Sequence, residues 1–537
     1  MIADTLPALL AARANVAAPA LIERGRLVSF RELAAESRRL AGGLQRLGLQ
    51  AGDRVALWLP NVPAWLASFY ACAQLGLIAL SVNTRFRSHE LADILHRSRS
   101  RALIFWPEFK GIDFAAILAQ CDAQALEHLS TVVVYSESSG PAPQAVAGKR
   151  ALAYAEIAGG EPLEEHRAGP EAGCILFTTS GTTKAPKFVL HSQRAVISHA
   201  LDVTKAFAIG ADSVMLLAPP LCGVFGFCSA TAALVAGRPL VMTPAWNAEQ
   251  AARDIAAHRV THANGTDDAI AQLLAQSDAE RPFPHSGAKS PFPSVRFIGY
   301  AAFNPAQGDI VARAEARGLK LVGLYGTSEI QALFARQDED APAAERMLAG
   351  GLPVSPMARV RARDPESGRI LPHGEPGELE FLAPAGRMLG YLDDPAATLA
   401  AFTDDQYYRS GDLGYSQADG RFVYLTRIGD SLRLGGFLVS PAEIETVVQE
   451  VPGIAACQMV GVPRAGGLAA VAFVVLEKGA SLDEQGVIGH VAARLARYKV
   501  PQRVLPIDAF PVTPGANATK IQKGKLREMA IALLHCK

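Results

Sequence analysis

The sequence has no net charge, no long apolar run and no signal-like start. Its 537 residues carry 52 basic and 52 acidic side chains, so no overall field favours nucleic acid or an anionic membrane as a partner. No stretch of 18 apolar residues occurs, so we expect no membrane span. The start, Met1 to Asp4, lacks the basic and apolar segments of a signal peptide.

Paired cysteines are absent as well. The seven cysteines form no CxxC pair and are odd in number; they stand at positions 72, 121, 174, 222, 228, 457 and 536. This predicts reduced core residues in a cytoplasmic protein rather than a disulfide framework or a zinc site. Half of the residues are hydrophobic and 19% are charged, which is typical of a globular protein. A chain of this length exceeds one core, so we expect two or more domains.

Apolar strands alternate with helices over the first half of the chain. A capping box at Ser29–Glu32 begins a helix that we expect to reach residue 48, and apolar runs at 55–59, 102–105 and 131–135 predict strands. This alternation predicts an α/β fold with parallel pairing. From about residue 350 short strands with Gly/Pro turns predict antiparallel pairing, and strands and helices from 457 onward predict a compact unit of about 110 residues.

A loop of small residues follows the apolar run at 174–177. Thr179, Ser180, Gly181, Thr182 and Thr183 precede Lys187, and their N–H and hydroxyl groups can surround phosphate oxygens because nothing bulky intervenes. The spacing is not that of a Walker loop, since Pro186 stands where the second glycine belongs. Taken alone, the stretch fits an ordinary Ser/Thr turn equally well.

Four other segments carry candidate functional residues. The buried-type strand at 321–324 ends in Tyr325 to Glu329, where open α/β sheets bind ligands, although a capped helix start fits equally well. Asp412 falls in an apparent turn, and Lys520 in a lysine-bearing loop before the last helix. The apolar stretch 216–227 fits a pocket wall, but plain core is the commoner case.

The order of these motifs resembles the adenylate-forming superfamily of acyl- and aryl-CoA synthetases, peptide-synthetase adenylation domains and firefly luciferase. The resemblance runs from about residue 25 to the end. It rests on the phosphate loop, Tyr325–Glu329, Tyr408–Asp412, Arg427, the Gly435-Gly436 turn, Leu495–Pro501 and Lys520, all in the superfamily's order.

The resemblance implies a large N-terminal domain of stacked α/β layers with a β-barrel-like subdomain, over residues 1–428. A small α+β lid domain would follow at 429–537, with Gly429 as the hinge. The implied substrates are ATP, Mg²⁺ and coenzyme A (CoA) together with a small-molecule carboxylic acid. A carboxylate would attack the α-phosphate of ATP, and the acyl group would then pass to a thiol.

The resemblance also implies a role for each matching residue. Glu329 would bind Mg²⁺, and Lys520 would bridge the reacting carboxylate and the α-phosphate. ATP would contact Thr179, Ser180, Gly181, Thr182, Thr183, Lys187, Tyr325, Gly326, Thr327, Ser328, Asp412 and Arg427. The acid would lie near Gly223, Phe225, Gly226, Tyr300, Ala301 and Ala302, and CoA near Gly435 and Gly436.

The sequence departs from the superfamily pattern at several positions. Lys184 and Phe188 occupy loop positions that are usually glycine, and a bulky side chain there can stiffen the loop. Ser328 replaces threonine but keeps the hydroxyl. Gly223 replaces a histidine beside the acyl site, and Tyr300 lies in a stretch usually rich in glycine, where it would shorten the acyl channel if it points inward.

We expect an acid:CoA ligase that acts on an aryl, alicyclic or medium-chain acid. No carrier segment follows the lid, which favours free CoA as the acceptor. Two alternatives are an adenylation enzyme that loads a separate carrier protein and a catalytically silent nucleotide-binding homologue. A homodimer is compatible with the sequence, and nothing in it favours a luciferase-like oxygenase.

Overall fold

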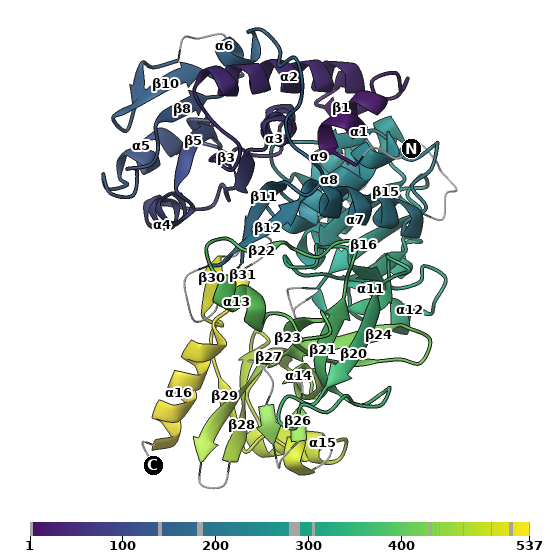
Figure 1. Cartoon of the computed structure of the whole chain (residues 1–537). Coiled ribbons are helices and arrows are strands. Elements are labelled where there is room, and N and C mark those ends of the chain that lie inside the picture. Colours follow the sequence, from purple (N-terminus) through teal and green to yellow (C-terminus); the bar gives the residue numbers. More distant parts are fainter. Residues whose placement is uncertain are drawn as a thin grey trace.

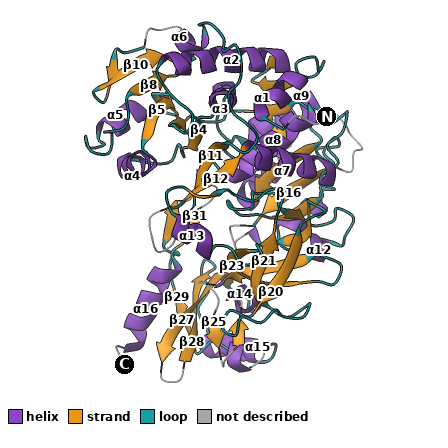
Figure 2. Cartoon of the chain, viewed as in Figure 1, coloured by secondary structure: helices purple, strands orange, loops and turns teal. Residues whose placement is uncertain are grey.

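The computed structural model describes residues 4–137, 142–179, 186–278, 290–302, 307–428, 432–434, 437–439, 441–464, 467–495, 497–514 and 519–535. Two large sheets and a smaller C-terminal unit organise these residues (Figures 1 and 2). Their helices are α1 (Leu6–Ala12), α2 (Phe30–Arg46), α3 (Pro63–Leu75), α4 (Ser88–Ser98), α5 (Phe114–Ala119), α6 (Tyr154–Ala158), α7 (Gln193–Ala206), α8 (Val224–Ala236), α9 (Ala248–His258), α10 (Asp267–Asp278), α11 (Ile310–Glu315), α12 (Ala343–Arg346), α13 (Pro395–Ala400), α14 (Pro441–Gln449), α15 (Glu484–Ala492) and α16 (Lys523–His535).

The nine-stranded sheet is parallel through its middle, as the alternation of strands and helices predicts. Its order is β22 (Gly390–Tyr391), β12 (Phe188–Ser192), β11 (Gly173–Thr178), β4 (Ile78–Ser81), β3 (Arg54–Trp58), β5 (Ser100–Phe105), β8 (Thr131–Val134), β10 (Lys149–Ala153) and β9 (Ala145–Val146). The strands from β11 to β10 pair in parallel, whereas β12 and β22 at one edge and β9 at the other pair antiparallel. The phosphate-loop segment therefore joins β11 to its antiparallel neighbour β12.

The thirteen-stranded sheet changes from parallel to antiparallel along its width. Its order is β2 (Arg26–Ser29), β1 (Pro19–Glu23), β14 (Leu240–Met242), β13 (Met215–Leu217), β15 (His262–Thr266), β16 (Phe297–Ala301), β17 (Leu321–Tyr325), β18 (Ala335–Arg336), β19 (Gly350–Pro353), β24 (Phe422–Arg427), β23 (Tyr408–Ser416), β21 (Gly377–Leu382) and β20 (Arg359–Arg363). Strands β14 to β17 pair in parallel, and pairing from β17 to β20 is antiparallel. The short strands with Gly/Pro turns that follow residue 350 thus pair antiparallel, as expected from the sequence.

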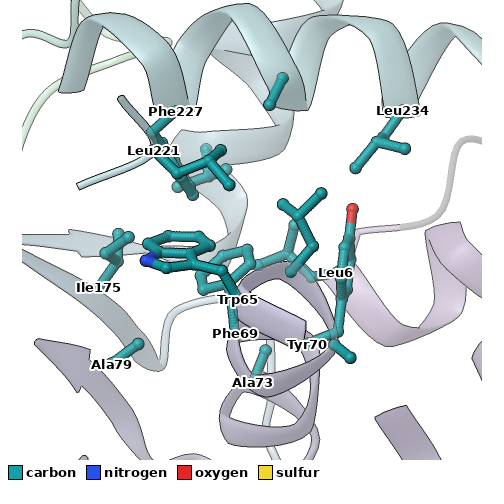
Figure 3. Packing of buried hydrophobic residues seen from close by; sticks show 14 of the residues in the cluster. Leu6, Trp65, Phe69, Tyr70, Ala73, Ala79, Ile175, Leu221, Phe227 and Leu234 are labelled. Atoms are coloured by element: carbon teal, nitrogen blue, oxygen red, sulfur yellow. The ribbon is translucent and has the colours of Figure 1, made fainter. Parts of the chain in front are cut away.

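The main core lies between the two sheets and contains α3, α7 and α8. Every residue of α3 is buried, and α8 is almost as apolar, as expected of helices covered on all sides. Trp65 and Phe69 of α3 meet Phe227 of α8 with ring centroids 6.2 and 5.1 Å apart (Figure 3). This packing fixes the two sheets relative to each other, and with them the strand ends that form the candidate site.

The C-terminal unit is built on β27 (Ile454–Arg464), β28 (Gly467–Leu476) and β29 (Arg503–Pro506). Its sheet has α14 and α15 in one apolar cluster and α16 in another. Two hairpins flank it, β25 (Leu432–Leu434) with β26 (Phe437–Val439) and β30 (Val512–Pro514) with β31 (Thr519–Ile521), while β6 (Glu108–Phe109) and β7 (Ile112–Asp113) form a third hairpin near α5. The strands and helices expected after residue 457 are confirmed.

Two further expectations from the sequence concern membrane-spanning helices and the state of the cysteines. No helix in the ranges described above is long and apolar enough to cross a membrane. The described cysteines are all free, and all of them except Cys222 are buried, so they behave as core side chains.

Candidate active site

A tightly held loop follows β17 and carries Glu329. The backbone of Gly326 approaches that of Ala332 so closely that a Cβ at Gly326 would lie 2.6 Å from the Ala332 Cα. Gln331 and Leu333 adopt left-handed backbone conformations, with φ of 65° and 63°. The amide of Gln331 donates to the Ala195 carbonyl on α7 at 2.9 Å. The alternative of a capped helix start is therefore wrong here, because left-handed backbone conformations and side-chain contacts shape this loop.

Two buried histidines, one on β12 of the nine-stranded sheet and one on α7, hold the same loop by hydrogen bonds. His191 on β12 bonds the Ser328 carbonyl at 2.7 Å, and His199 on α7 bonds the Ala332 carbonyl at 2.7 Å. Burial lowers the pKa of each imidazole to about 4, so both are neutral near pH 7 and donate from Nε2. Two neutral donors thus fix the loop at both ends without adding charge near Glu329.

The Glu329 side chain is buried and faces the segment that leads into β22. The Tyr391 hydroxyl donates to Glu329 Oε1 at 2.9 Å, and the Met388 N–H donates to the Glu329 carbonyl at 2.8 Å. Lys187, which begins the chain's return from the phosphate loop, has its Nζ 4.4 Å from the centre of the Tyr391 ring. The Glu329 carboxylate and the Lys187 ammonium, which come from segments next to different sheets, therefore both contact Tyr391.

The two ends of the phosphate loop are held together by its own backbone. Thr179 N–H donates to the Lys187 carbonyl at 2.9 Å, and Lys187 N–H donates to Thr179 Oγ1 at 3.1 Å. Residues Ser180, Gly181, Thr182, Thr183 and Lys184 lie outside the described residues. Phe188, the first residue of β12, is buried, and the Arg97 guanidinium lies 4.6 Å from its ring centre. The residue that replaces the usual glycine thus attaches the start of β12 to α4.

Asp412 lies inside β23, so the expectation of an exposed turn is wrong. It is 3% exposed, and its Oδ2 accepts a hydrogen bond of 2.5 Å from the Tyr325 hydroxyl. Arg427 on β24 is directly opposite in the strand register, with its Nη1 3.0 Å from Asp412 Oδ1. That nitrogen also donates to the Ser410 carbonyl at 2.6 Å. The register brings together three residues that the sequence places at 325, 412 and 427.

Burial dominates the electrostatics of this cluster. Desolvation raises the pKa of Asp412 to about 6 although Arg427 and the Tyr325 hydroxyl oppose the shift. Desolvation, with the Asp412 charge added, also raises the pKa of Tyr325, which keeps its hydroxyl protonated as a donor. The Tyr325 ring packs at 5.1 Å from Phe381 and Phe422. Whether it also contacts adenine stays a prediction.

Two buried oxygen atoms at the site have no hydrogen-bond partner among the described residues. They are Thr327 Oγ1 and Asp412 Oδ1, although Asp412 Oδ1 is ion-paired with Arg427 Nη1 at 3.0 Å without a well-aligned hydrogen bond. An unsatisfied buried polar atom is costly and rare, so Thr327 Oγ1 suits a ligand that brings a polar group of its own, such as a phosphate, while Asp412 Oδ1 can still accept a hydrogen bond from a ribose hydroxyl. In the same ranges no group of three His, Cys, Asp or Glu side chains could hold a metal ion. The binding of Mg²⁺ by Glu329, with phosphate oxygens and water as the further ligands, therefore stays a prediction.

The expected acid-binding residues are not all together. Phe225 and Ala301 belong to the core between the sheets, whereas Tyr300 points to the opposite face of β16, where its hydroxyl donates to the Met347 carbonyl at 2.5 Å. Gly223 caps α8, and a Cβ at Gly226 would collide with the Pro220 carbonyl oxygen. Ala302 is exposed beyond the end of β16. Because strand residues alternate in direction, Tyr300 does not join the others, and the shortened channel expected from it is not supported.

The lid residues are only partly described. Lys520 lies in β31, where its backbone pairs with Thr513, but nothing is described of its side chain. Gly429, Gly435 and Gly436 lie outside the described residues. Their expected roles as hinge and CoA contacts stay predictions, as does the domain boundary at 428/429.

Sequence reasoning missed Tyr391, His191, His199 and Gln331. Each touches the Glu329 loop, yet each sits in an apolar stretch where its residue type carries no distinctive signal. Only the pairing of β22 with β12 brings Tyr391 beside Lys187. The Gly-Tyr pair at the short β22 was the one available cue.

Comparison with known proteins shows the family of this chain. Residues 10–392 match the AMP-binding enzyme family model, and residues 443–516 match the AMP-binding enzyme C-terminal domain model. The sulfoacetate–CoA ligase of Cupriavidus necator is 30% identical and the match covers 97% of each chain; feruloyl-CoA synthase of an Amycolatopsis species is 30% identical over 96% of each. The ATP-bound structure of MatB from Rhodopseudomonas palustris superposes with a TM-score of 0.79 at 25% identity, covering 97% of this chain and 98% of that one.

Proposed function

Since this chain belongs to the AMP-binding enzyme family, we propose that it activates its carboxylic acid at the cluster formed by Glu329, Thr327 and Asp412. It is an ATP-dependent acid:CoA ligase that forms an acyl adenylate and then an acyl-CoA thioester. The single observation that carries the proposed site is the convergence of these three buried side chains, with the Thr327 hydroxyl unsatisfied, where the loop after β17 meets the middle of β23.

Different polar side chains of the site contact the ribose, the α-phosphate and the outer phosphates of ATP. Asp412 Oδ1 accepts a hydrogen bond from a ribose hydroxyl, and Arg427 helps to hold that end. Thr327 lies at the α-phosphate, while Thr179 and Lys187, with the loop between them, hold the outer phosphates. Mg²⁺ bound to Glu329 and the phosphates would neutralise negative charge on the triphosphate. These assignments place the whole of ATP along the line from β23 to β12.

The first half-reaction needs two anions to approach each other. The carboxylate oxygen forms a bond to the α-phosphorus, and the bond from that phosphorus to the leaving pyrophosphate oxygen breaks. Lys520 would contact both the carboxylate and the α-phosphate and stabilise the charge on the five-coordinate phosphorus. In the second half-reaction the sulfur of CoA attacks the acyl carbon, and AMP leaves. Movement of the C-terminal unit about Gly429 would withdraw Lys520 and admit the thiol.

The acid is an aryl, alicyclic or medium-chain one. Support comes from the apolar wall at Phe225, the missing side chain at Gly223 and the small residues Ala301 and Ala302. Among the relatives, one enzyme is named for the aryl acid ferulate and another for sulfoacetate, a small charged acid. The acid panel should therefore include both kinds. We infer that the enzyme works in the cytoplasm, where ATP and CoA are available.

The test is acid-dependent exchange of labelled pyrophosphate into ATP over a panel of carboxylic acids, with Lys520→Ala alongside. Exchange with particular acids, reduced about 10²–10³-fold in the variant, is the expected result because one preorganised donor to the transition state is lost. CoA and a carrier protein are then offered with the best acid. Thioester on the carrier but not on CoA would refute the CoA assignment, and ATP binding without exchange for any acid would refute activation at this site. Light scattering in solution tests whether the chain forms the homodimer that its sequence leaves possible.

A further inference from the structure

Tyr391 lies between two groups that the proposed function assigns to the triphosphate. Its hydroxyl donates to Glu329 Oε1 at 2.9 Å, and the Lys187 ammonium lies over its ring, 4.4 Å from the ring centre. No side chain within the described ranges makes a hydrogen bond to Glu329 Oε2. One face of the carboxylate is thus occupied by tyrosine, and the other oxygen remains for a cation.

The tyrosine itself is fixed on several sides. Its backbone pairs with Val189 across β22 and β12, and its N–H donates to Thr398 Oγ1 at 2.8 Å. Its ring packs with Val189 and Met388 and is 8% exposed. Gly390, with φ of 154°, lets the chain pass so close to Thr398 that a Cβ would lie 2.9 Å from its methyl carbon. A side chain held this firmly can orient the groups that touch it.

We propose that Tyr391 is a positioning residue that orients Glu329 for Mg²⁺ and holds Lys187 beside it. One side chain would thus align both the Mg²⁺ ligand and the ammonium group that contact the triphosphate. This inference rests on the proposed function. It differs from a plain packing role because it predicts a change in the Mg²⁺ dependence of ATP binding.

The chemistry of the contact supports an orienting role. The Tyr391 hydroxyl donates directly to Glu329 Oε1, and a phenol keeps its proton near neutral pH. A hydrogen bond to an ionised acceptor is about twice as strong as one between neutral groups, and it selects one carboxylate orientation. A lysine held over an aromatic face loses less freedom when a phosphate arrives than one that is free in solvent.

Isothermal titration of ATP binding, without any acid present, separates the two contacts. Tyr391→Phe removes only the hydroxyl, and we expect MgATP to bind about five- to thirtyfold more weakly while ATP in EDTA binds within about twofold of the parent, from the loss of one charge-assisted hydrogen bond. Tyr391→Leu removes the ring as well, and we expect ATP in EDTA to bind about three- to tenfold more weakly, since the Lys187 contact is lost too.

The chain offers a matched control in Tyr154→Phe. Tyr154 is also buried and donates to a glutamate, Glu36, at 2.8 Å, but it lies between α6 and α2, away from the site. The control should leave both affinities unchanged. Near-UV circular dichroism confirms that each variant is folded, and if Tyr391→Leu is not, Tyr391→Phe decides the question alone.

Glu329→Gln distinguishes failure of the inference from failure of the proposed function. The Mg²⁺ effect is the difference in affinity between MgATP and ATP in EDTA. If Glu329→Gln loses this Mg²⁺ effect and Tyr391→Phe keeps it, the inference is overturned and the role of Glu329 stands. If Glu329→Gln also keeps the Mg²⁺ effect, the proposed metal role of Glu329 is itself refuted. Equal weakening in Tyr391→Phe and Tyr154→Phe would likewise overturn the inference, because it would reflect a general loss of stability.

Discussion

Replacing Asp412 by asparagine should make the free protein more stable while it disables ATP binding. The carboxylate is 3% exposed, and burial raises its pKa from 3.8 to about 6. A raised pKa means that folding favours the protonated acid, so the ionised form costs stability at neutral pH. Asparagine mimics the neutral acid in size and can still accept the hydrogen bond from Tyr325.

The size of the effect follows from the pKa shift. A shift of about two pH units corresponds to about 3 kcal/mol at 1.36 kcal/mol per unit, and this value already includes the attraction of Arg427 for the ionised carboxylate that Asp412→Asn removes. The Arg427 side chain is about half exposed and can be hydrated instead, so we expect a net gain of about 1–3 kcal/mol. The gain is full above pH 6, falls to about half near pH 5 and vanishes below pH 3.8.

Thermal unfolding of Asp412→Asn and the parent, without ligand, at pH 8 and pH 5 measures this directly. We expect a higher midpoint for the variant at pH 8 and a smaller difference at pH 5, together with at least a 10²-fold loss of pyrophosphate exchange. A variant less stable than the parent at pH 8, or a difference that does not change with pH, would refute the reasoning that burial of this charge is unfavourable.

Three other substitutions test the site and its supports. Thr327→Val removes a buried hydroxyl that has no partner among the described residues, so we expect an unchanged or slightly higher unfolding midpoint but about a tenfold higher KM for ATP in the exchange assay; a clear fall in the midpoint would contradict this. Phe188→Gly restores the usual glycine but deletes a buried ring at the start of β12, and should cost about 3–5 kcal/mol in urea unfolding and raise the KM for ATP, whereas an unchanged stability would show that the ring does not stabilise this strand. Gly226→Ala should lower the yield of folded protein, since its Cβ meets the Pro220 carbonyl, while Gly489→Ala, which has open space around it, serves as the control that should fold normally.

The local sequence was enough to predict the alternating first half, the change to antiparallel pairing near residue 350 and the strands and helices of the C-terminal unit. These features depend on apolar periodicity and on turn residues close together in the chain. The order of short motifs was enough to recognise the family, because catalysis requires particular residue types at the ends of particular strands. Glu329, Thr327 and Asp412 were identified in this way.

Tertiary structure alone decided the environment of those residues. Asp412 looked like a turn former, yet its register opposite Arg427 and its contact with Tyr325 bury it and raise its pKa. The direction of Tyr300 depended on the phase of β16, which a short apolar run does not reveal. Tyr391 reaches Glu329 only because β22 joins the edge of β12. Burial, register and contacts between distant segments are set by packing of the whole chain, so no local pattern records them.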